Sequence, residues 1–402
     1  MSDVAPASRT ERPRRPGVQR YQLSKKAVAV VATGHPWLFR GLMSSAAAGL
    51  ADGQWLALYD GGNQVVGHGV YAAEGAVAVR LVGQGPTRPR GPAWLARIDA
   101  AVARRGSLRA ETDGFRAIAG ESDHMPGVVV DVFGTTVVAQ AYATGLDALA
   151  RLAARRVAAA VGATGVVVRA GHRRFGARGA GPRIIAGAAP DLAWFREGPL
   201  RLAARPLSGQ KSGTFLDLRG LRRWLRQAPL AGARVLNLFA YTGALGLACE
   251  HAGASVITQI DRAADALAFA AGHHVVDAAR HRFITADVFD WCRQAPGDQR
   301  FEVVIVDPPS MTSRIEQVPA ALATYRRLHG AAAARVAPGG LLILACCTSR
   351  ITRAQFRATA LATVGRGFAL TADVPPEVDH PVAFPEADYL KVLVFRARGA
   401  GA

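Results

Sequence analysis

The sequence of 402 residues predicts a doubly wound, Rossmann-like α/β domain in its C-terminal half, preceded by a small β domain and a central α+β domain. After about Leu200, strand-like and helix-like stretches alternate, which is typical of a parallel sheet with helices on both faces. Between about Val18 and Gly85 only short β-rich runs occur, separated by Gly-Gly and Glu-Gly turns. The Pro/Arg/Gly-rich stretch 83–92 divides this β-rich part from the rest of the chain.

These patterns divide the chain into four segments. Residues 1–17 combine Pro, Arg and Ser without periodicity and are expected to be a disordered basic arm. Residues 18–87 form the β module, 88–198 the central α+β domain and 199–402 the doubly wound domain. Within the central domain, the Gly/Arg-rich stretch 172–183 has no apolar face, and it is expected to be a basic loop that either contacts RNA or is simply solvated.

The charge balance suggests a polyanionic partner. Lys and Arg total 49 and Asp and Glu total 30, so the net charge is +19 and the pI is near 11. RNA or DNA is the usual partner of such a protein. Only Lys25, Lys26, Lys211 and Lys391 are lysines, so arginine supplies the other 45 basic residues, and a codon bias in an Ala-rich chain is the alternative explanation.

Composition also narrows the class of protein. Hydrophobic residues make up 50% of the chain and charged residues 20%, which excludes an intrinsically disordered protein. The four cysteines form no Cys-x-x-Cys pair, so neither a disulfide framework nor a zinc ribbon is indicated, and no other metal site is expected. No signal peptide and no membrane-spanning stretch is recognisable, and a cytoplasmic location is expected.

The first strand of the doubly wound domain leads into the tight turn "AYTGALG", and Asp261 ends the next strand. Such a turn offers backbone amides, and the acid suits ribose hydroxyls. A dinucleotide would call for Gly-x-Gly-x-x-Gly, but only Gly243 and Gly246 are present, which disfavours an NAD oxidoreductase. S-adenosylmethionine, which carries adenosine but no phosphate, is therefore the favoured ligand.

Two later strand ends support this ligand. Asp287, in "ITADVFDW", is placed to accept from an adenine amino group. Asp307, Pro308 and Pro309 end a buried strand and form a rigid wall suited to clamping a planar base. The alternative for Asp307 is a cap of the following helix. Acids and turns at four successive strand ends together favour S-adenosylmethionine binding.

The next strand ends in "LILACCTS", with Cys346 and Cys347. A buried cysteine is most often a small apolar residue. Because neighbours on a strand point to opposite sides, only one of the pair can face the strand-end site. A thiolate there indicates 5-methylcytosine chemistry, since cytosine C5 becomes nucleophilic only after a thiolate has added to C6.

Two further segments supply polar residues. "SGQKSGTFLDLRGLRRWLR" holds Lys211, Asp217 and Arg219, and the rarity of lysine hints at a compact cation near a ligand. The alternative is a surface loop leading into a basic amphipathic helix. Near the C-terminus, His380 and Lys391 lie in a Pro-broken stretch that could cover the site, although a lone His is more often structural.

These residues resemble a known family, the bacterial large-subunit ribosomal RNA cytosine-C5 methyltransferases with an N-terminal PUA domain. The resemblance spans nearly the whole chain after the arm. Its motifs are "HPWLFRG" at 35–41, "FRAIAGESDHMPGVVVDVFG" at 115–134, "GQKSGTFLDLR" at 209–219, "VLNLFAYTG" at 235–243, "VDPPS" at 306–310 and "DHPV" with "YLK" between 379 and 391.

The resemblance implies a PUA domain, a central domain that helps to grip RNA and a class I methyltransferase domain that uses S-adenosylmethionine. The family's nucleophile corresponds to Cys347, and Asp307 is expected to hold the target base. The donor site is then expected to comprise Gln210, Lys211, Asp217, Arg219, Asn237, Phe239, Tyr241, Thr242, Gly243, Asp261, Asp287, Val288, Asp307 and Pro308. Large-subunit ribosomal RNA is the expected partner, and a homodimer is compatible with the resemblance.

The chain departs from the family pattern at a few positions. Cys346 stands where the family has Ser, which leaves Cys346 as the alternative nucleophile. "LDLR" replaces the family's "LDQR", and Leu221 replaces an Asn, so a polar contact beside the donor is missing. Two alternatives therefore stay open: methylation of a guanine without a cysteine nucleophile, and an inactive RNA-binding or ribosome-assembly factor.

Overall fold

The computed structural model describes residues 17–171, 181–209 and 213–399, which form two compact units. One unit comprises residues up to 90 together with 143–147, and the other comprises 91–142 and the residues from 148 onward. The expected basic arm, most of the 172–183 loop, Gln210 and Lys211 lie outside the described residues. In the described part, no helix is long and apolar enough to cross a membrane.

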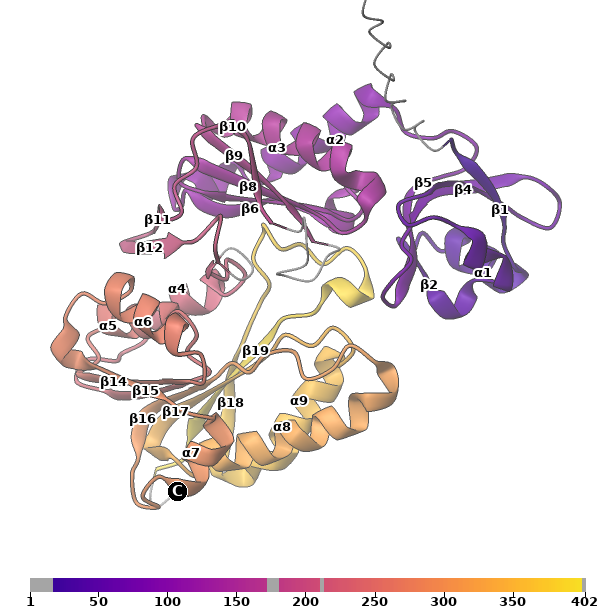
Figure 1. Cartoon of the computed structure of the whole chain (residues 1–402). Coiled ribbons are helices and arrows are strands. Elements are labelled where there is room, and N and C mark those ends of the chain that lie inside the picture. Colours follow the sequence, from indigo (N-terminus) through magenta and orange to yellow (C-terminus); the bar gives the residue numbers. More distant parts are fainter. Residues whose placement is uncertain (1–16, 172–180, 210–212, 400–402) are drawn as a thin grey trace, which may run out of the picture. The chain divides into compact units, whose positions relative to one another are not determined.

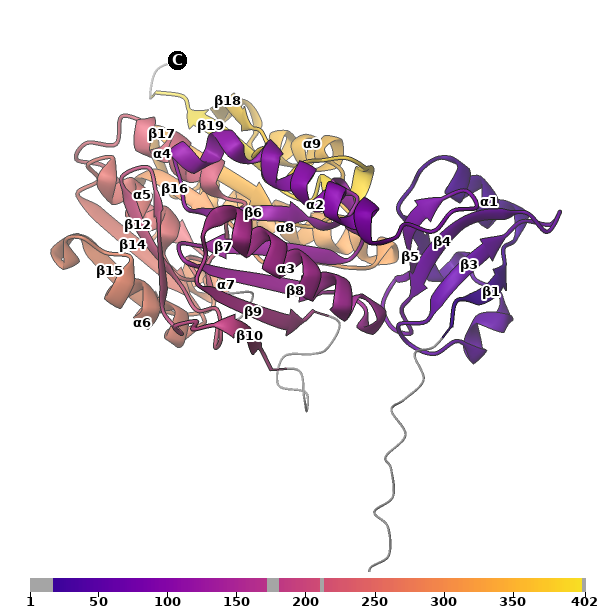
Figure 2. The same cartoon turned by 90° about the horizontal axis from the view of Figure 1, so that it is seen from above.

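The first unit is built on a five-stranded sheet with the strand order β1-β3-β4-β5-β2 (Figure 2). Its strands are β1 (Gln19–Gln22), β2 (Trp37–Phe39), β3 (Trp55–Tyr59), β4 (Val65–Tyr71) and β5 (Val77–Gln84). Helix α1 (Lys25–Ala32) begins at Ser24, whose hydroxyl accepts from the Ala27 amide, and buries Ala27 and Val31 one turn apart. The expected β module is therefore present, with one short helix added.

The second unit begins with a central α+β domain, as the sequence predicts. Its sheet has the order β10-β9-β8-β7-β6, and helices α2 and α3 lie on one face of it (Figure 1). The α3 crossover joins the parallel strands β8 and β9, whereas the other neighbours pair antiparallel. The elements are α2 (Gly91–Arg104), β6 (Gly114–Ala119), β7 (Val128–Phe133), β8 (Thr136–Ala141), α3 (Asp147–Val161), β9 (Gly165–Ala170) and β10 (Arg183–Gly187), followed by the hairpin β11 (Ala193–Glu197) and β12 (Leu200–Ala204).

The doubly wound domain has a seven-stranded sheet with the order β15-β14-β13-β16-β17-β19-β18. Strands β13 to β17 are parallel, and only β19 runs antiparallel to its neighbours. The strands are β13 (Arg234–Leu238), β14 (Val256–Asp261), β15 (His281–Thr285), β16 (Phe301–Val306), β17 (Val336–Cys346), β18 (Phe368–Val374) and β19 (Lys391–Ala397). The strand order reverses direction at β13 and β16, so the ligand site of such a sheet is expected at their carboxyl ends.

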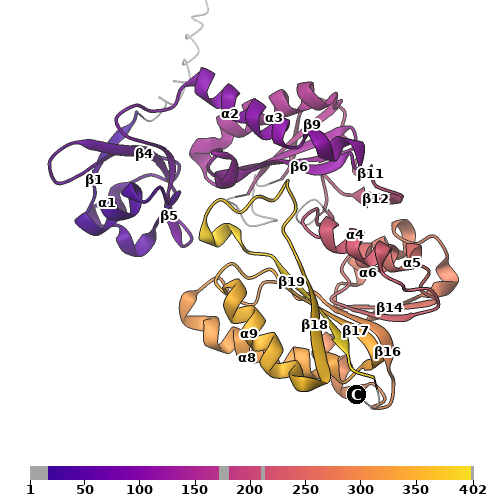
Figure 3. The same cartoon turned by 180° about the vertical axis from the view of Figure 1, so that it is seen from behind.

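Helices cover both faces of this sheet (Figure 3). They are α4 (Arg219–Gln227), α5 (Ala244–His251), α6 (Ala264–His273), α7 (Val288–Gln294), α8 (Val318–Ala333) and α9 (Arg353–Val364). Strand residues alternate between two apolar clusters: Val303, Ile343 and Ala345 join the cluster of α4 and α5, whereas Val304, Leu344 and Cys346 join that of α8 and α9. The alternation fixes the face to which each residue at a strand end is directed.

Helix α4 connects the two domains of the second unit through its arginines. Arg222 is 1% exposed and forms hydrogen bonds of 2.5–3.0 Å with the buried Glu197 carboxylate at the end of β11. Arg223 donates to Glu111 and Glu377 at 3.0–3.2 Å. Two arginines of this basic helix are therefore paired with carboxylates of the same chain, and their charges are not available to bind RNA.

Replacing Arg222 by Leu is expected to lower the free energy of unfolding by about 3–5 kcal/mol, because the change leaves Glu197 buried and unpaired. Chemical denaturation monitored by circular dichroism measures this loss. Arg326→Leu, on the exposed side of α8, is the matched control and is expected to change stability by less than about 0.5 kcal/mol. Equal effects of the two substitutions would contradict a structural role for the Arg222–Glu197 pair.

Candidate active site at the carboxyl ends of the strands

Strands β13, β14, β16 and β17 end at the same edge of the parallel sheet and carry most of the predicted site residues there. The turn 239–243 follows β13, Asp261 ends β14, Asp307 follows β16 and Cys347 follows β17. Pairing in register brings these ends together, because Leu238 pairs with both Ile260 and Val306. The topology therefore gathers residues that are more than 100 positions apart in the sequence.

The turn after β13 has an unusual backbone. Phe239, Tyr241 and Gly243 all have left-handed φ angles of +61°, +48° and +73°. Such angles are rare for residues other than Gly and concentrate at functional sites. Asp261 holds the turn in place, because its carboxylate oxygens accept from the Tyr241 and Ala263 amides at 2.9 and 2.8 Å. Each oxygen retains a second lone pair for a ligand hydroxyl.

A buried polar layer supports the turn from below. Gln259, fully buried in β14, accepts from the Asn237 amide at 3.2 Å, and a Cβ atom on Gly246 would lie only 2.6 Å from its amide group. His274 donates from Nδ1 to the Thr242 carbonyl at 2.5 Å and accepts at Nε2 from the Ala203 amide at 2.9 Å. Neither Gln259 nor His274 is predicted as a site residue from the sequence. A polar Gln inside the apolar strand "VITQI" could have indicated a buried hydrogen-bonding role for Gln259.

Asp287 caps a helix. Its exposed carboxylate accepts from the Phe289 and Asp290 amides at 2.8 and 3.2 Å and so begins α7, whose first residue, Val288, is buried. The two backbone amides both donate to Oδ1 of Asp287. A contact with an adenine amino group would use the other carboxylate oxygen, Oδ2. The capping role that the sequence left open for Asp307 thus falls to Asp287, since no helix begins within 307–314.

Asp307 has a strongly perturbed carboxyl group. Burial, together with the neighbouring negative charge of Asp217, raises the pKa of Asp307 to about 7. Asp217 in turn accepts a hydrogen bond of 2.8 Å from the Tyr389 hydroxyl. At neutral pH about half of the Asp307 carboxyls are therefore protonated, and a protonated carboxyl can donate a hydrogen bond to a base edge.

The two adjacent cysteines have different surroundings. Cys346 is fully buried in the apolar cluster beneath α8 and α9. Cys347 is only partly buried, and its thiol lies 3.5 Å from the Pro308 carbonyl oxygen, beside Asp307. Of the two thiols, that of Cys347 is therefore the one that contacts Pro308, directly after Asp307.

Thr348, which follows Cys347, ties the ends of three strands together. Its hydroxyl accepts from the Met311 amide at 3.1 Å and lies 3.3 Å from the buried Tyr325 hydroxyl. Its carbonyl accepts from the Lys391 ammonium at 3.0 Å, which also donates to the Tyr389 carbonyl at 3.1 Å. The loop that carries Cys347 is thereby fixed to the loop after Asp307 and to the start of β19.

The remaining predicted residues are buried. Arg219 is fully buried and donates to Glu377 at 3.0 Å and to Asp379, so its guanidinium is engaged by these acids. Burial alone would raise the pKa of Asp379, but His380 and Arg219 hold it well below the usual value. His380 thus has a structural partner. Leu221, where the family has Asn, is buried in an apolar cluster together with Leu218.

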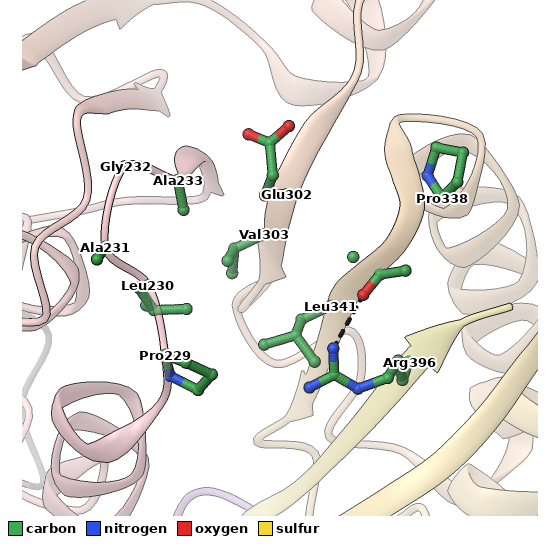
Figure 4. Close-up of a pocket in the computed structure, with 12 residues that line it drawn as sticks. Pro229, Leu230, Ala231, Gly232, Ala233, Glu302, Val303, Pro338, Leu341 and Arg396 are labelled. Atoms are coloured by element: carbon green, nitrogen blue, oxygen red, sulfur yellow. Dashed lines mark hydrogen bonds between the residues drawn. The ribbon is translucent and has the colours of Figure 1, made fainter. Parts of the chain in front are cut away.

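A cavity of about 300 Å³ lies at the opposite edge of the sheet (Figure 4). It is lined by Leu230, Glu302 and Leu341 among others, and by Arg396, which donates to the Gly339 carbonyl at 2.9 Å. These residues lie at the amino ends of β13, β16 and β17, whereas ligands of doubly wound sheets bind at the carboxyl ends. This cavity is therefore not the candidate site.

The strand-end residues fit a nucleoside ligand that carries positive charge and no phosphate. Asp217, Asp261, Asp287 and Asp307 are carboxylic acids, and they would repel a pyrophosphate but attract a sulfonium. The left-handed turn and Asp261 offer backbone and carboxylate contacts suited to a ribose. The chemistry of the site thus favours S-adenosylmethionine over a dinucleotide.

Comparison with known proteins agrees with this assignment. The model of the S-adenosylmethionine-dependent methyltransferases matches residues 123–396, and that of the PUA-like domain matches 22–84. A ribosomal RNA large subunit methyltransferase from Deinococcus radiodurans is 32% identical over 394 residues, which cover 93% of this chain and 96% of that protein. Ribosomal RNA large subunit methyltransferase I from Serratia proteamaculans is 28% identical, covering 90% and 95%.

Solved structures show the same fold. A methyltransferase structure from Streptococcus mutans superimposes with a TM-score of 0.80 at 20% identity, covering 94% of this chain and all of that one. A methyltransferase solved in complex with S-adenosylhomocysteine matches with the same TM-score at 21% identity and 94% coverage of this chain. The predicted fold class, a doubly wound methyltransferase domain after a PUA-like domain, is confirmed.

Proposed function

Because this chain belongs to the S-adenosylmethionine-dependent methyltransferase family and carries a PUA-like domain, we propose that it methylates large-subunit ribosomal RNA at C5 of a cytosine, with Cys347 as the nucleophile. The RNA class is supported by the names of its relatives from Deinococcus radiodurans and Serratia proteamaculans, which align over nearly their full lengths. A net charge of +19 suits the same partner.

One observation carries the choice of cytosine C5. Cys347 lies at the carboxyl edge of the sheet with its thiol 3.5 Å from the carbonyl oxygen of Pro308, the residue that follows Asp307, and the pKa of the Asp307 carboxyl is raised to about 7. A thiol, together with a carboxyl on the neighbouring strand end that can donate a proton, is what addition to a cytosine ring requires. Methyl transfer to a guanine would use neither group.

The reaction can be written from these residues. When bound, S-adenosylmethionine supplies an electrophilic methyl group. The Cys347 thiolate adds to C6 of a flipped cytosine while the protonated Asp307 donates to N3, so that electron density accumulates at C5. C5 then bonds to the methyl carbon as the bond from that carbon to the donor sulfur breaks, which leaves S-adenosylhomocysteine. A base removes the C5 proton, N3 returns its proton to Asp307, and the bond between C6 and the Cys347 sulfur breaks with release of the thiolate, so that the aromatic ring is restored.

The donor site is proposed to form around the turn 239–243. The backbone of Phe239, Tyr241, Thr242 and Gly243 would line the adenosine, while Asp261 would accept from the ribose hydroxyls and Asp287 from the adenine amino group. Asn237 would support the turn through Gln259.

Asp217 and Pro308 would border the methyl group together with Asp307, and Arg219 would hold this region through Glu377 and Asp379. Gln210 and Lys211, proposed at the same site, lie outside the described residues.

Nucleoside mass spectrometry tests the proposed reaction. Large-subunit ribosomal RNA from a strain that lacks this protein is incubated with the purified protein and labelled S-adenosylmethionine. Label in 5-methylcytosine is the expected result. Label in a methylguanine would keep the donor site but overturn the role of Cys347, and tight RNA binding without any labelled nucleoside would favour an assembly factor.

Replacing Asp261 by Ala is expected to raise the dissociation constant for S-adenosylmethionine about 10- to 100-fold, because hydrogen bonds to a charged acceptor contribute about 1.5–3 kcal/mol. The change also removes the acceptor of the Tyr241 and Ala263 amides. Isothermal titration calorimetry measures the affinity, and Asp265→Ala, at an exposed position of α6, is the control. Unchanged affinity in the Asp261 variant would contradict the placement of the ribose.

A further inference from the structure

Lys391 stands out among the buried residues that the proposed reaction does not use. Its side chain is fully buried, although a lysine is almost never buried without a partner of opposite charge. Its ammonium donates only to neutral groups, the carbonyls of Thr348 and Tyr389 at 3.0 and 3.1 Å, and it forms no ion pair with any carboxylate in the described part of the chain. Such an arrangement leaves a full positive charge inside the protein.

The neighbouring charged groups do not neutralise this charge. Asp388 is the nearest acidic residue in sequence, but its carboxylate is occupied by Arg353, which donates to both of its oxygens at 2.8 and 3.2 Å. Arg353 also donates to Asp373, so that its own charge is balanced within this cluster. Tyr325, on α8, is a buried phenol whose pKa is raised by burial and by the nearby thiol of Cys346, and it stays neutral.

The groups that remain close to the ammonium are the two thiols. Lys391 is paired in register with Cys346 across β17 and β19, and its ammonium holds the carbonyl of the residue that follows Cys347. Burial and the nearby charge of Arg353 lower the pKa of Lys391, while Cys346, Asp388 and Cys347 act in the opposite direction. Cys346 points into the apolar cluster, so Cys347 is the thiol that can both lose its proton to solvent and approach a substrate.

We infer that Lys391 is a positioning residue that holds the loop of Cys347 by its carbonyl contacts and stabilises the Cys347 thiolate by its buried charge. A cation next to a thiol favours the charged form and so lowers the pKa of the thiol. The effect is stronger inside the protein than in water because the surroundings screen less. This inference rests on the proposed role of Cys347 and adds the group that activates it.

The test measures the thiol itself, without RNA or methyl donor. In a Cys346→Ala background, the rate at which iodoacetamide alkylates Cys347 is followed from pH 5 to pH 10 by peptide mass spectrometry, where the thiolate sulfur bonds to carbon and iodide leaves. Lys391→Gln keeps hydrogen-bond donors for the two carbonyls but removes the charge. It is expected to raise the midpoint pH by about one unit or more and to slow alkylation near pH 7 about tenfold.

Two further variants separate the charge from the carbonyl contacts. Lys391→Arg keeps the charge and is expected to leave the midpoint close to that of the parent. Lys391→Met removes both charge and donors, and it should shift the midpoint as Lys391→Gln does. If Lys391→Gln folds, as thermal unfolding shows, but keeps the parental midpoint, the inference is wrong and Lys391 only holds the loop.

The outcome is separable from that of the proposed function. A charge-dependent midpoint with no 5-methylcytosine formation would support the inference about the thiol while overturning the reaction. If 5-methylcytosine is formed but the alkylation midpoint of Cys347 is the same with and without the charge of Lys391, the proposed reaction is supported and the inference about Lys391 is wrong. If Lys391→Gln and Lys391→Met are too unstable to measure, Lys391→Arg is the variant that tests the inference. A rise of its alkylation midpoint by one pH unit or more, although the charge is retained, would contradict the inference.

Discussion

Replacing Cys347 by Ala is expected to abolish methylation of large-subunit ribosomal RNA, with a rate at least about 10³-fold below that of the parent protein. Without the thiolate no covalent bond to C6 can form, and C5 is then not nucleophilic enough to accept a methyl group. The affinity for S-adenosylmethionine should stay close to that of the parent protein, because Cys347 lies outside the turn 239–243 that would hold the adenosine. Incorporation of labelled methyl groups and calorimetric titration measure the two quantities.

Cys346→Ala is the matched control, since it removes the neighbouring thiol from the apolar cluster. It is expected to retain most of the activity and to lower the free energy of unfolding by about 1 kcal/mol through the small cavity that it creates. The opposite pattern, with an inactive Cys346 variant and an active Cys347 variant, would transfer the nucleophile to Cys346. Full activity in both variants would favour a reaction that needs no cysteine.

Replacing Asp307 by Asn is expected to lower the rate of methylation about 10²-fold or more and, at the same time, to stabilise the fold at alkaline pH. The activity falls because an amide cannot pass a proton to N3 of the cytosine. The stability rises because Asn carries no charge into a site where burial and Asp217 disfavour the carboxylate.

The pH dependence of this stabilisation has a definite sign. Since the pKa of Asp307 is about 7 in the folded protein and near 4 in the unfolded chain, its favourable contribution is complete below about pH 4 and is lost as the pH rises to about 7. The gain from Asn should therefore be about 2–3 kcal/mol larger at pH 8 than at pH 5. Denaturation at both pH values measures it, and an equal gain at pH 5 and pH 8 would show that Asp307 ionises normally.

Much of the fold could be predicted from the sequence, because local patterns determine it. The alternation of strands and helices after Leu200 indicates the parallel sheet, and the carboxyl ends of its strands indicate where Asp261 and Asp307 meet. Side chains alternate between the two faces of a strand, so the sequence also indicates that Cys346 and Cys347 have different surroundings. The sequence could not show which of the two cysteines lies on which face of the sheet. The apolar clusters on the two faces supply that information.

Other features depend on contacts between distant segments and leave no local signal. The pairing of Tyr389 with Asp217 joins residues 172 positions apart. For the segment that contains α4, a surface loop leading into a basic amphipathic helix is one alternative that the sequence leaves open, yet Arg222 is buried against Glu197 because β11 packs there, which no pattern near residue 222 reveals. The capping role was considered for Asp307 but belongs to Asp287, since only the three-dimensional structure shows which acid precedes a helix.

The buried acid Asp379 has a consequence for how the protein is made. Its carboxylate binds Arg219 and the Arg116 amide, and its carbonyl accepts from Arg105, which lies 274 residues earlier in the chain. During translation Arg219 leaves the exit tunnel long before its partners Glu377 and Asp379, whereas Arg105 can already pair with Asp123. The buried contacts of Arg219 with Glu377 and Asp379 can therefore form only after synthesis has passed residue 379. A chain that ends before residue 379 would leave the buried Arg219 guanidinium without its acid partners, and we expect such a chain to be less stable.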